Sequence, residues 1–273
     1  MGKDLRHFVV GAVVVLALFI IPGCSGNGTD SGNTSTIDSK IDLSMSEHLD
    51  SIQHTLTFRA QTERIYGCSN YALSGSESVS GKTISVTFNN VTDPAVCATA
   101  LGPAATNFDL GALAPGLYTF PIIVNGEISS STLTITDSTY SILSGGGRWV
   151  GFTKTFLMKV PVGAVWGSAS YNAPTAGTFY RTFTDSLNAF GAIPHQYSAG
   201  DYGYFQIDSS GTLILPSGTS NFHATFILQY NGDTQKVKAV LKQIGQSVGS
   251  QIVIAFYSYK GEAYISNVVA FQP

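Results

Sequence analysis

The chain has 273 residues, of which 44% are hydrophobic and 11% are charged, and its formal net charge is −3. Globular proteins usually contain about 25% charged residues, and a helical bundle needs Glu and Lys on its wet faces, so this composition favours an exported β protein. No stretch is basic enough to predict binding to nucleic acid, and the length fits one or two domains.

The first residues of the chain predict an export signal. Lys3 and Arg6 supply a short positive start, and an apolar run extends from Phe8 to Ile21. A bilayer core of about 30 Å needs about 20 apolar residues, so this shorter run does not suit a transmembrane helix. It is typical of the core of a signal peptide.

A four-residue motif ends this run: Ile21, Pro22, Gly23 and Cys24. These residues resemble the lipobox of bacterial lipoproteins, in which an aliphatic, a variable and a small residue precede the cysteine. The resemblance implies that residues 1–23 are a signal peptide and that the Cys24 thiol receives diacylglycerol and further acyl chains such as palmitate, which together anchor a protein stably. Ser25 implies sorting to the outer membrane of a two-membrane cell envelope. The alternative is a conventional signal peptide that is cut elsewhere.

Residues 24–47 are expected to form a flexible tether. The stretch from Ser25 to Lys40 is rich in small and polar residues, and Ile37 is its only large apolar residue. Such a stretch buries too little surface to offset the entropy of ordering. We expect the tether to space the folded part from the membrane.

Residues 48–143 predict an immunoglobulin-like β-sandwich, because apolar and polar residues alternate along short runs. The segment from Leu113 to Tyr118 resembles the tyrosine corner of immunoglobulin-like and fibronectin-like sandwiches, in which a tyrosine hydroxyl bonds to the backbone just upstream. Phe120 stands where antibody domains have a cysteine, so the resemblance concerns the fold alone. The alternating runs contain the following residues: Leu56, Phe58 and Ala60; Ile84, Val86 and Phe88; Tyr118, Phe120, Ile122 and Val124; Leu133 and Ile135.

Two further cysteines, Cys68 and Cys97, lie in this first domain. In an oxidising compartment we expect them to form a disulfide. The bond would close a loop of about 30 residues and stabilise the fold by roughly 3–4 kcal/mol. Two reduced, buried thiols are the alternative. No histidine is near either cysteine in sequence, so we expect no metal site here.

Residues 147–273 predict a second β-rich domain, a sandwich or barrel with one or two short helices. The boundary is expected at Ser144–Gly147. Alternation predicts strands at these positions: Val150, Phe152, Phe156, Met158 and Val160 on one face; 202–208 and 212–215; Phe222 to Tyr230; and a hairpin of 251–259 and 263–271 around Lys260–Glu262.

Two segments of the second domain have helical spacing. Phe179, Phe183, Leu187 and Phe190 are spaced as on one face of a helix, which is expected to end near Gly191. Residues 235–244 fit either a helix or a strand, and the turn before them favours the strand.

The chain carries none of the motifs of serine hydrolases, P-loop proteins, zinc proteases or EF-hands, so no catalytic residue, metal ligand or cofactor is expected. His195, Asp201 and a nearby serine can be imagined as a hydrolase site, and the stretch from Asp201 to Asp208 as a calcium site, but nothing in the sequence favours either. Asp208 and Asp233 lie in turns, where Asp has a structural role.

The most distinctive candidate for binding is the stretch from His195 to Tyr204. It places Tyr197, Tyr202 and Tyr204 among small residues. Tyrosines on loops give rigid contact area at low entropic cost, and they stack on sugars. The alternative is that Tyr202 and Tyr204 cover a sheet edge.

The leading hypothesis is a non-catalytic binding or envelope-structural lipoprotein. It would be held to a membrane through Cys24 and would contact a glycan, a peptide or an envelope protein through the second domain. The alternative is a secreted hydrolase whose site is assembled in the second domain from residues distant in sequence.

Overall fold

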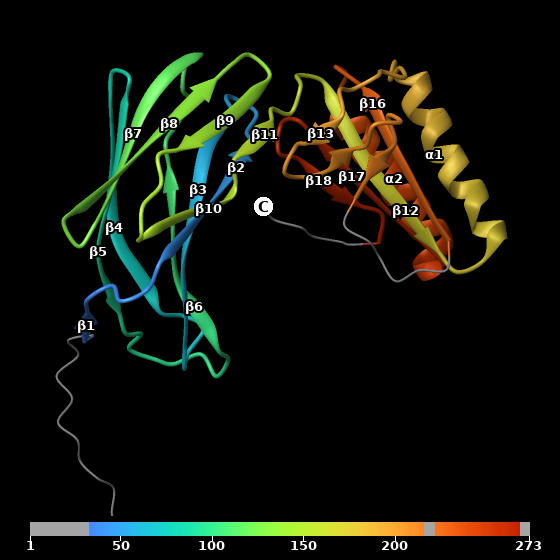
Figure 1. Ribbon diagram of the computed structural model, residues 1–273. Helices are drawn as coiled ribbons and strands as arrows, with labels where there is room; N and C mark the ends of the chain where they lie inside the picture. The colour runs from blue at the N-terminus through green and yellow to red at the C-terminus, as the bar shows by residue number, and fades with distance from the viewer. Residues whose placement is uncertain (1–32, 216–221, 268–273) are drawn as a thin grey trace, which may run out of the picture. The chain divides into compact units, whose positions relative to one another are not determined.

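The computed structural model describes residues 33–215 and 222–267. The expected signal peptide and Cys24 lie outside the described residues. This described part of the chain is mainly β with two α-helices, as the sequence predicts (Figure 1). Within the described part of the chain, neither helix is long and apolar enough to cross a membrane.

The N-terminal part is one large, nearly closed sheet of eleven strands, in the order β10-β2-β3-β6-β4-β5-β7-β8-β9-β11, with β1 paired to β5. The two outermost strands, β10 and β11, follow each other in the chain with only Thr155 between them, so the two edges of the sheet meet there. The strands are β1 Thr34–Ser35, β2 Ile41–His48, β3 Thr55–Tyr66, β4 Ala72–Ser80, β5 Thr83–Thr92, β6 Gly102–Asp109, β7 Gly116–Val124, β8 Glu127–Ile135, β9 Thr139–Ser144, β10 Val150–Lys154 and β11 Phe156–Met158.

The core of this sheet is made by alternate residues of its strands, as the sequence predicts. Each strand turns one set of side chains inward, because successive side chains of a strand point to opposite faces. Phe58 and Phe120 meet in the core with ring centroids 5.3 Å apart. The fully enclosed residues include Ile41, Leu43, Phe58, Ala60, Ile84, Val86, Phe120, Ile122, Val124 and Leu133.

The first domain begins earlier than predicted. The expected tether reaches residue 47, whereas Ile41–His48 form β2, paired along its length with β3. Ile37 is also buried, with 2% of its surface exposed. The alternation of Ile41, Leu43 and Met45 is the strand signal, and the polar residues between them point away from the core.

The first domain also ends later than predicted. The glycines at 145–147 do not separate two domains, since β10 pairs with β2 and β11 pairs with β9 of the large sheet. The single strand expected from Val150 to Val160 is two short strands. The phase changes between them, so that Phe156 is 49% exposed and Leu157 is buried.

Two predicted details of the first domain are confirmed. The Tyr118 hydroxyl donates a hydrogen bond to the carbonyl oxygen of Ala114 at 2.7 Å, which is the geometry of a tyrosine corner. Cys68 and Cys97 form a disulfide, with their Cα atoms 5.3 Å apart.

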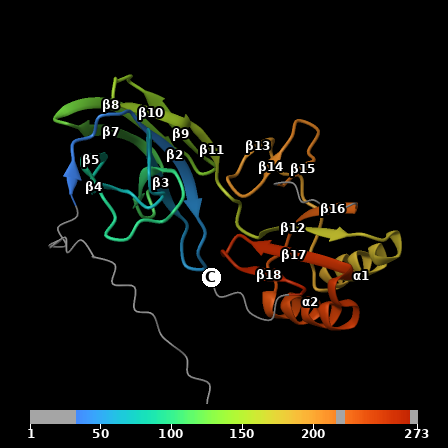
Figure 2. The ribbon, with the colours of Figure 1, turned by 90° about the horizontal axis from the view of Figure 1, so that it is seen from below.

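The C-terminal part is built on an antiparallel sheet in the order β16-β12-β17-β18, with both helices against one face. Figure 2 shows α1 and α2 on one side of β12 and β17 and a small three-stranded sheet on the other. The arrangement is therefore an open layered sheet. The elements are β12 Ala164–Tyr171, α1 Gly177–Ala189, β13 Gly200–Asp201, β14 Gln206–Ile207, β15 Leu213–Ile214, β16 Phe222–Gln229, α2 Thr234–Val248, β17 Ile252–Ser258 and β18 Ala263–Ile265, with short 3₁₀ turns at Pro174–Ala176 and Gly249–Gln251.

The alternation of β12 explains the two layers. Val165 and Ala169 face the helices, whereas Trp166 faces the small sheet and packs on Phe205, with ring centroids 4.9 Å apart. Both faces of β12 are covered, which fits the lack of charged residues in this strand.

The helix at Gly177–Ala189 confirms the prediction, but the strand expected at 235–244 is wrong. This segment belongs to α2, whose buried residues Val237, Leu241 and Ile244 follow helical spacing. The Asp233 carboxylate begins the helix by accepting a hydrogen bond from the Gln235 backbone N–H at 2.9 Å. The preceding turn, which favoured a strand, is the cap of a helix.

The hairpin at the C-terminal end is confirmed where the structure describes it. β17 pairs with β18 in antiparallel register, from Ala255 opposite Ile265 to Tyr257 opposite Ala263. The last part of the expected second strand, from 268 onward, lies outside the described residues.

Candidate functional site

A pocket of about 290 Å³ lies in the stretch where the sequence predicts binding. One wall is the loop before β13, and the other is the turn between β14 and β15. Its lining is mostly polar and small: Gln196, Tyr197, Ser198, Ala199, Asp208, Ser209 and Gly211.

Two of the three predicted contact tyrosines are core residues. Tyr197 is 6% exposed and its hydroxyl donates to the carbonyl oxygen of Leu228 at 3.0 Å, while burial raises its pKa to about 12. Tyr202 is 1% exposed and its hydroxyl donates to the carbonyl oxygen of Ser198 at 2.9 Å. Both hydroxyls are therefore used within the fold.

The third tyrosine, Tyr204, keeps a free surface. It is 40% exposed, and its hydroxyl donates to the backbone carbonyl oxygen of Glu47 at 2.8 Å. Its ring lies 5.9 Å from that of Trp166. Tyr204 thus links β2 to the small sheet, and only part of its ring remains available to a partner.

The structure does not bring together His195 and Asp201, the two residues considered for a hydrolase site. His195 is exposed and packs edge-on against Tyr197, with ring centroids 4.6 Å apart. The Asp201 carboxylate pairs instead with Lys154 at 2.7 Å and accepts the Gly203 backbone N–H at 2.7 Å. The carboxylate that a catalytic histidine would need for orientation is thus bound elsewhere.

Asp208 has the structural role that its turn predicts. Its carboxylate accepts hydrogen bonds from the Ser210 hydroxyl at 2.6 Å and from the Thr212 backbone N–H at 2.8 Å. These bonds, the one from the Ser210 hydroxyl first, lower its pKa below the ordinary value. The pocket therefore offers hydroxyl and amide groups for hydrogen bonding to a polar ligand, and its one carboxylate already accepts hydrogen bonds at Oδ1.

A second cluster, which sequence reasoning missed, surrounds the side chain of Glu47. This carboxylate is 1% exposed. It accepts the Val160 backbone N–H at 2.7 Å and the Tyr140 hydroxyl at 3.1 Å, and it lies 3.4 Å from His54 Nδ1. Glu47 points inward in phase with the apolar residues of β2, which is the one signal that could have identified it.

His54 is held at both ring nitrogens. Its Nδ1 faces Glu47, and its Nε2 lies 2.6 Å from the carbonyl oxygen of Tyr259, an acceptor that favours a proton on that nitrogen. The hydrogen bond to Glu47 raises the pKa of His54 above its ordinary value of 6.5, against the opposing effect of burial. Because both nitrogens are occupied, this histidine orients structure and is not free to act as a general base.

The other two titratable residues near Glu47 are Tyr140 and Lys159, and burial shifts the pKa of each. Burial raises the pKa of Tyr140, and the neighbouring Glu47 adds to that effect. Burial lowers the pKa of Lys159, whose ammonium lies 4.8 Å from the centre of the Tyr140 ring. The cluster is a satisfied polar network inside the protein and not an open reaction site.

No protein-family model, no curated protein and no solved structure matches this chain. The interpretation of the pocket and of the cluster around Glu47 therefore depends on their geometry. Among residues 33–215 and 222–267, no three His, Cys, Asp or Glu side chains gather in a way that could hold a metal ion.

Most carboxylates of the C-terminal half serve the fold. Besides those of Asp201, Asp208 and Asp233, the Glu262 carboxylate accepts hydrogen bonds from the Thr234 and Ser258 hydroxyls, both at 2.7 Å. Two carboxylates free to act on one glycosidic bond are not found together in the described part of this half.

Proposed function

We propose that this protein is an exported lipoprotein, held to a membrane of the cell envelope by acyl chains on Cys24, and that its folded part is a non-catalytic binding or structural module. The observation that carries the proposal is the sequence of the motif itself. A short apolar run ends in an aliphatic residue, a small residue and a cysteine, at Ile21, Gly23 and Cys24.

The disulfide supports export. Cys68 and Cys97 are bonded, and such bonds persist in oxidising compartments and are rare in the cytosol. Cys24 is the one remaining cysteine of the chain, which leaves it available for lipid attachment.

The engaged polar groups support a non-catalytic role. Partners within the fold contact both oxygens of the Asp201 and Glu262 carboxylates, Oδ1 of Asp208 and both nitrogens of His54. The pocket beside β13–β15 is polar and small, and it suits a partner that makes hydrogen bonds, such as a glycan, a peptide or an envelope protein. Within residues 33–215 and 222–267, the geometry gives no support to the secreted hydrolase.

Fractionation of cells tests the anchor. The native protein is expected in the membrane fraction. The Cys24→Ser variant, exported behind the signal peptide of a non-lipidated protein in place of residues 1–23, is expected in the soluble fraction, because serine cannot carry the thioether-linked lipid. Ser25→Asp serves as the control, because it leaves the cysteine in place and changes only the sorting signal. A Cys24→Ser protein that stays with the membrane after a high-salt wash would contradict the proposal.

A glycan array and a peptide library test the binding role with the protein starting at Cys24. Ser209→Trp fills the pocket from an exposed position and is expected to abolish binding, whereas His223→Ala, on the exposed side of β16, is expected to leave it unchanged. Tyr197 and Tyr202 are unsuitable for this test because both are core residues. Binding that survives Ser209→Trp would show that the pocket is not the site.

A further inference from the structure

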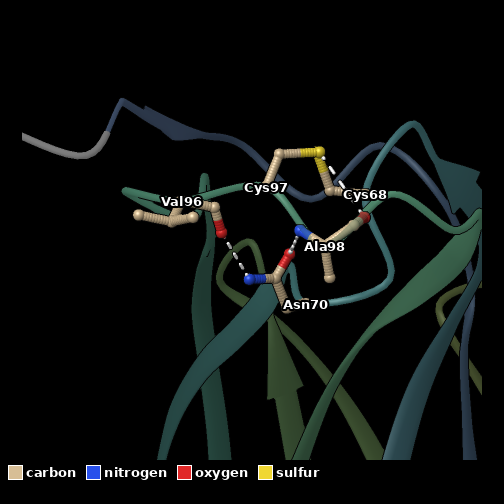
Figure 3. The surroundings of a disulfide bond; sticks show 5 residues. All are labelled: Cys68, Asn70, Val96, Cys97 and Ala98. Carbon is tan, nitrogen blue, oxygen red and sulfur yellow. Dashed lines mark hydrogen bonds between the residues drawn. A yellow bond between two sulfur atoms is a disulfide. The ribbon is translucent and has the colours of Figure 1, made fainter. Parts of the chain in front are cut away.

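At one end of the large sheet, the disulfide joins two loops that carry exposed apolar side chains. We define the disulfide tip as residues 67–71 and 93–101, which Cys68–Cys97 joins. Val96 is 79% exposed and Leu101 is 76% exposed. In Figure 3 the Val96 side chain points away from the disulfide and from Asn70. Isolated apolar residues are common on surfaces, so the tip needs further evidence before a partner is assigned.

Three hydrogen bonds within the tip satisfy part of its backbone. The Asn70 side-chain amide donates to the carbonyl oxygen of Val96 at 2.7 Å, and its oxygen accepts the Ala98 backbone N–H at 3.0 Å (Figure 3). The Ala100 backbone N–H donates to the Ala98 carbonyl oxygen at 2.8 Å. Polar backbone groups that are already paired reduce the penalty for entering an apolar environment.

The composition of the tip suits the boundary between lipid and water. Asp93 is the only charged residue in 67–71 and 93–101. Just behind the tip lies Tyr66, which stacks on Tyr71 of the tip with ring centroids 4.5 Å apart, and the Arg64 guanidinium lies 5.1 Å from the Tyr66 ring centre. Tyrosine and arginine behind an aliphatic edge are typical of surfaces that sit at a membrane interface.

The lipid-bearing end of the chain enters the sheet at this same tip. The Asp93 backbone N–H donates to the carbonyl oxygen of Asn33 at 3.1 Å, and Thr34 pairs with Thr92 at the end of β5. Nine residue steps separate Cys24 from Asn33. Each step spans at most about 3.3–3.6 Å, so Asn33 can lie no more than about 30 Å from a lipidated cysteine.

We propose that the disulfide tip docks on the bilayer that holds the lipid anchor, with Val96 and Leu101 reaching the boundary between the headgroups and the acyl chains. This inference rests on the proposed lipid attachment at Cys24. Two aliphatic side chains bind a bilayer weakly by themselves. A short connection to the anchor makes the contact intramolecular, so its effective concentration is high.

Tryptophan fluorescence on vesicles tests the contact. The protein starting at Cys24, which contains the compact unit Gly32–Pro273, is coupled through its one free thiol to a maleimide lipid in phosphatidylethanolamine–phosphatidylglycerol vesicles with brominated acyl chains. Val96→Trp and Leu101→Trp are expected to show a blue shift and a loss of emission relative to the unsubstituted protein, since brominated chains quench only tryptophans that reach them.

Leu117→Trp is the matched control. Leu117 is 64% exposed, and the parallel pairing of Thr83 with Thr119 places it beside the start of β5, at the far end of the sheet from the tip. The length of β5 separates the two ends by about 30 Å at about 3.3 Å per residue. The control is expected to show neither a shift nor quenching.

Hydrogen exchange gives a second measurement on the unsubstituted protein. Amides at 95–101 are expected to exchange more slowly in the vesicle-coupled protein than in protein capped at Cys24 with N-ethylmaleimide, and those at 111–117 are expected to be unchanged. The inference would be overturned if residues 95–101 exchanged at the same rate in the coupled and the capped protein and the tip tryptophans were unquenched. Because chemical coupling replaces native lipidation, that result would leave the proposed anchor itself untouched.

Discussion

Three polar groups from distant parts of the chain or from nearby turns contact the buried carboxylate of Glu47. Its partners come from β9, from the segment after β11 and from the turn before β3. Their separations in sequence are 93, 113 and 7 residues, so no local pattern could have connected all of them. The alternation of β2 does place Glu47 on the inward face. The sequence could therefore have identified a buried acid, but not the groups that satisfy it.

Replacing Glu47 with alanine is expected to lower the free energy of unfolding by about 3–5 kcal/mol, because it leaves His54 and the Val160 N–H without their buried partner. Urea denaturation measures the change. Glu63→Ala is the control, since that carboxylate is 50% exposed and pairs with Lys40 at 3.3 Å. It should cost less than about 1 kcal/mol. Equal losses for the two variants would contradict the role given to Glu47.

His54 predicts a dependence of stability on pH. Its pKa in the folded protein is raised above 6.5 by the Glu47 hydrogen bond, so the folded state holds this proton more tightly than the unfolded state. The stabilisation is fully present below 6.5 and is lost as pH rises through the folded pKa. Urea midpoints of the native protein should therefore fall over that window, and His54→Gln should flatten the profile. An unchanged slope in the variant would contradict this account.

Among the elements, strands with one buried face were the most predictable from sequence. The alternation in β3, β5, β7 and β16 identified them, and the corner at Tyr118 and the bond between Cys68 and Cys97 are also confirmed. The order of the strands could not be predicted, because it depends on pairings such as β10 with β2, whose strands begin at Val150 and Ile41. The sequence predicted only one wall of the pocket, the stretch from His195 to Tyr204. The second wall is the turn that contains Asp208, and no local pattern linked it to the first.

The start of α2 shows why a local pattern can mislead. Residues 235–244 satisfy both a strand and a helix, and the cap at Asp233 decides between them. Asp233→Ala is expected to lower the unfolding free energy by about 1 kcal/mol, the usual cost of losing an N-cap. Asp185→Ala, on the exposed side of α1, is the control and should change stability by less than about 0.5 kcal/mol. Thermal or urea unfolding distinguishes them, and equal effects would exclude the capping role.

The disulfide joins the loop between β3 and β4 to the loop between β5 and β6. Replacing Cys68 and Cys97 together with serine is expected to lower the unfolding free energy by roughly 3–4 kcal/mol, because the two cysteines are 29 residues apart and the open chain gains entropy when unfolded. The two unfolding curves should differ by that amount under non-reducing conditions and should converge when the native protein is reduced. A difference that persists after reduction would show that the serines act in another way.

At the scale of the whole molecule, the two parts predicted as separate domains share contacts. Leu49, just after β2, lies in one core cluster with Trp166 and Tyr202. Gly261 passes so close to the Leu49 carbonyl oxygen that a side chain there would clash, and its backbone has a positive φ of 77°. Residues Gly32–Pro273 accordingly form one compact unit. The glycines at 145–147 resemble a linker, so the sequence alone predicts two separate domains.

The central claim concerns how this unit is held in the cell. Intact-mass and peptide mass spectrometry of protein purified from envelope membranes measures it most directly. The account predicts mature chains that begin at Cys24, with diacylglycerol and a further acyl chain on that residue and with Cys68 and Cys97 still bonded. Mature chains that begin at another residue, with the Cys24 sulfur unmodified, would contradict it.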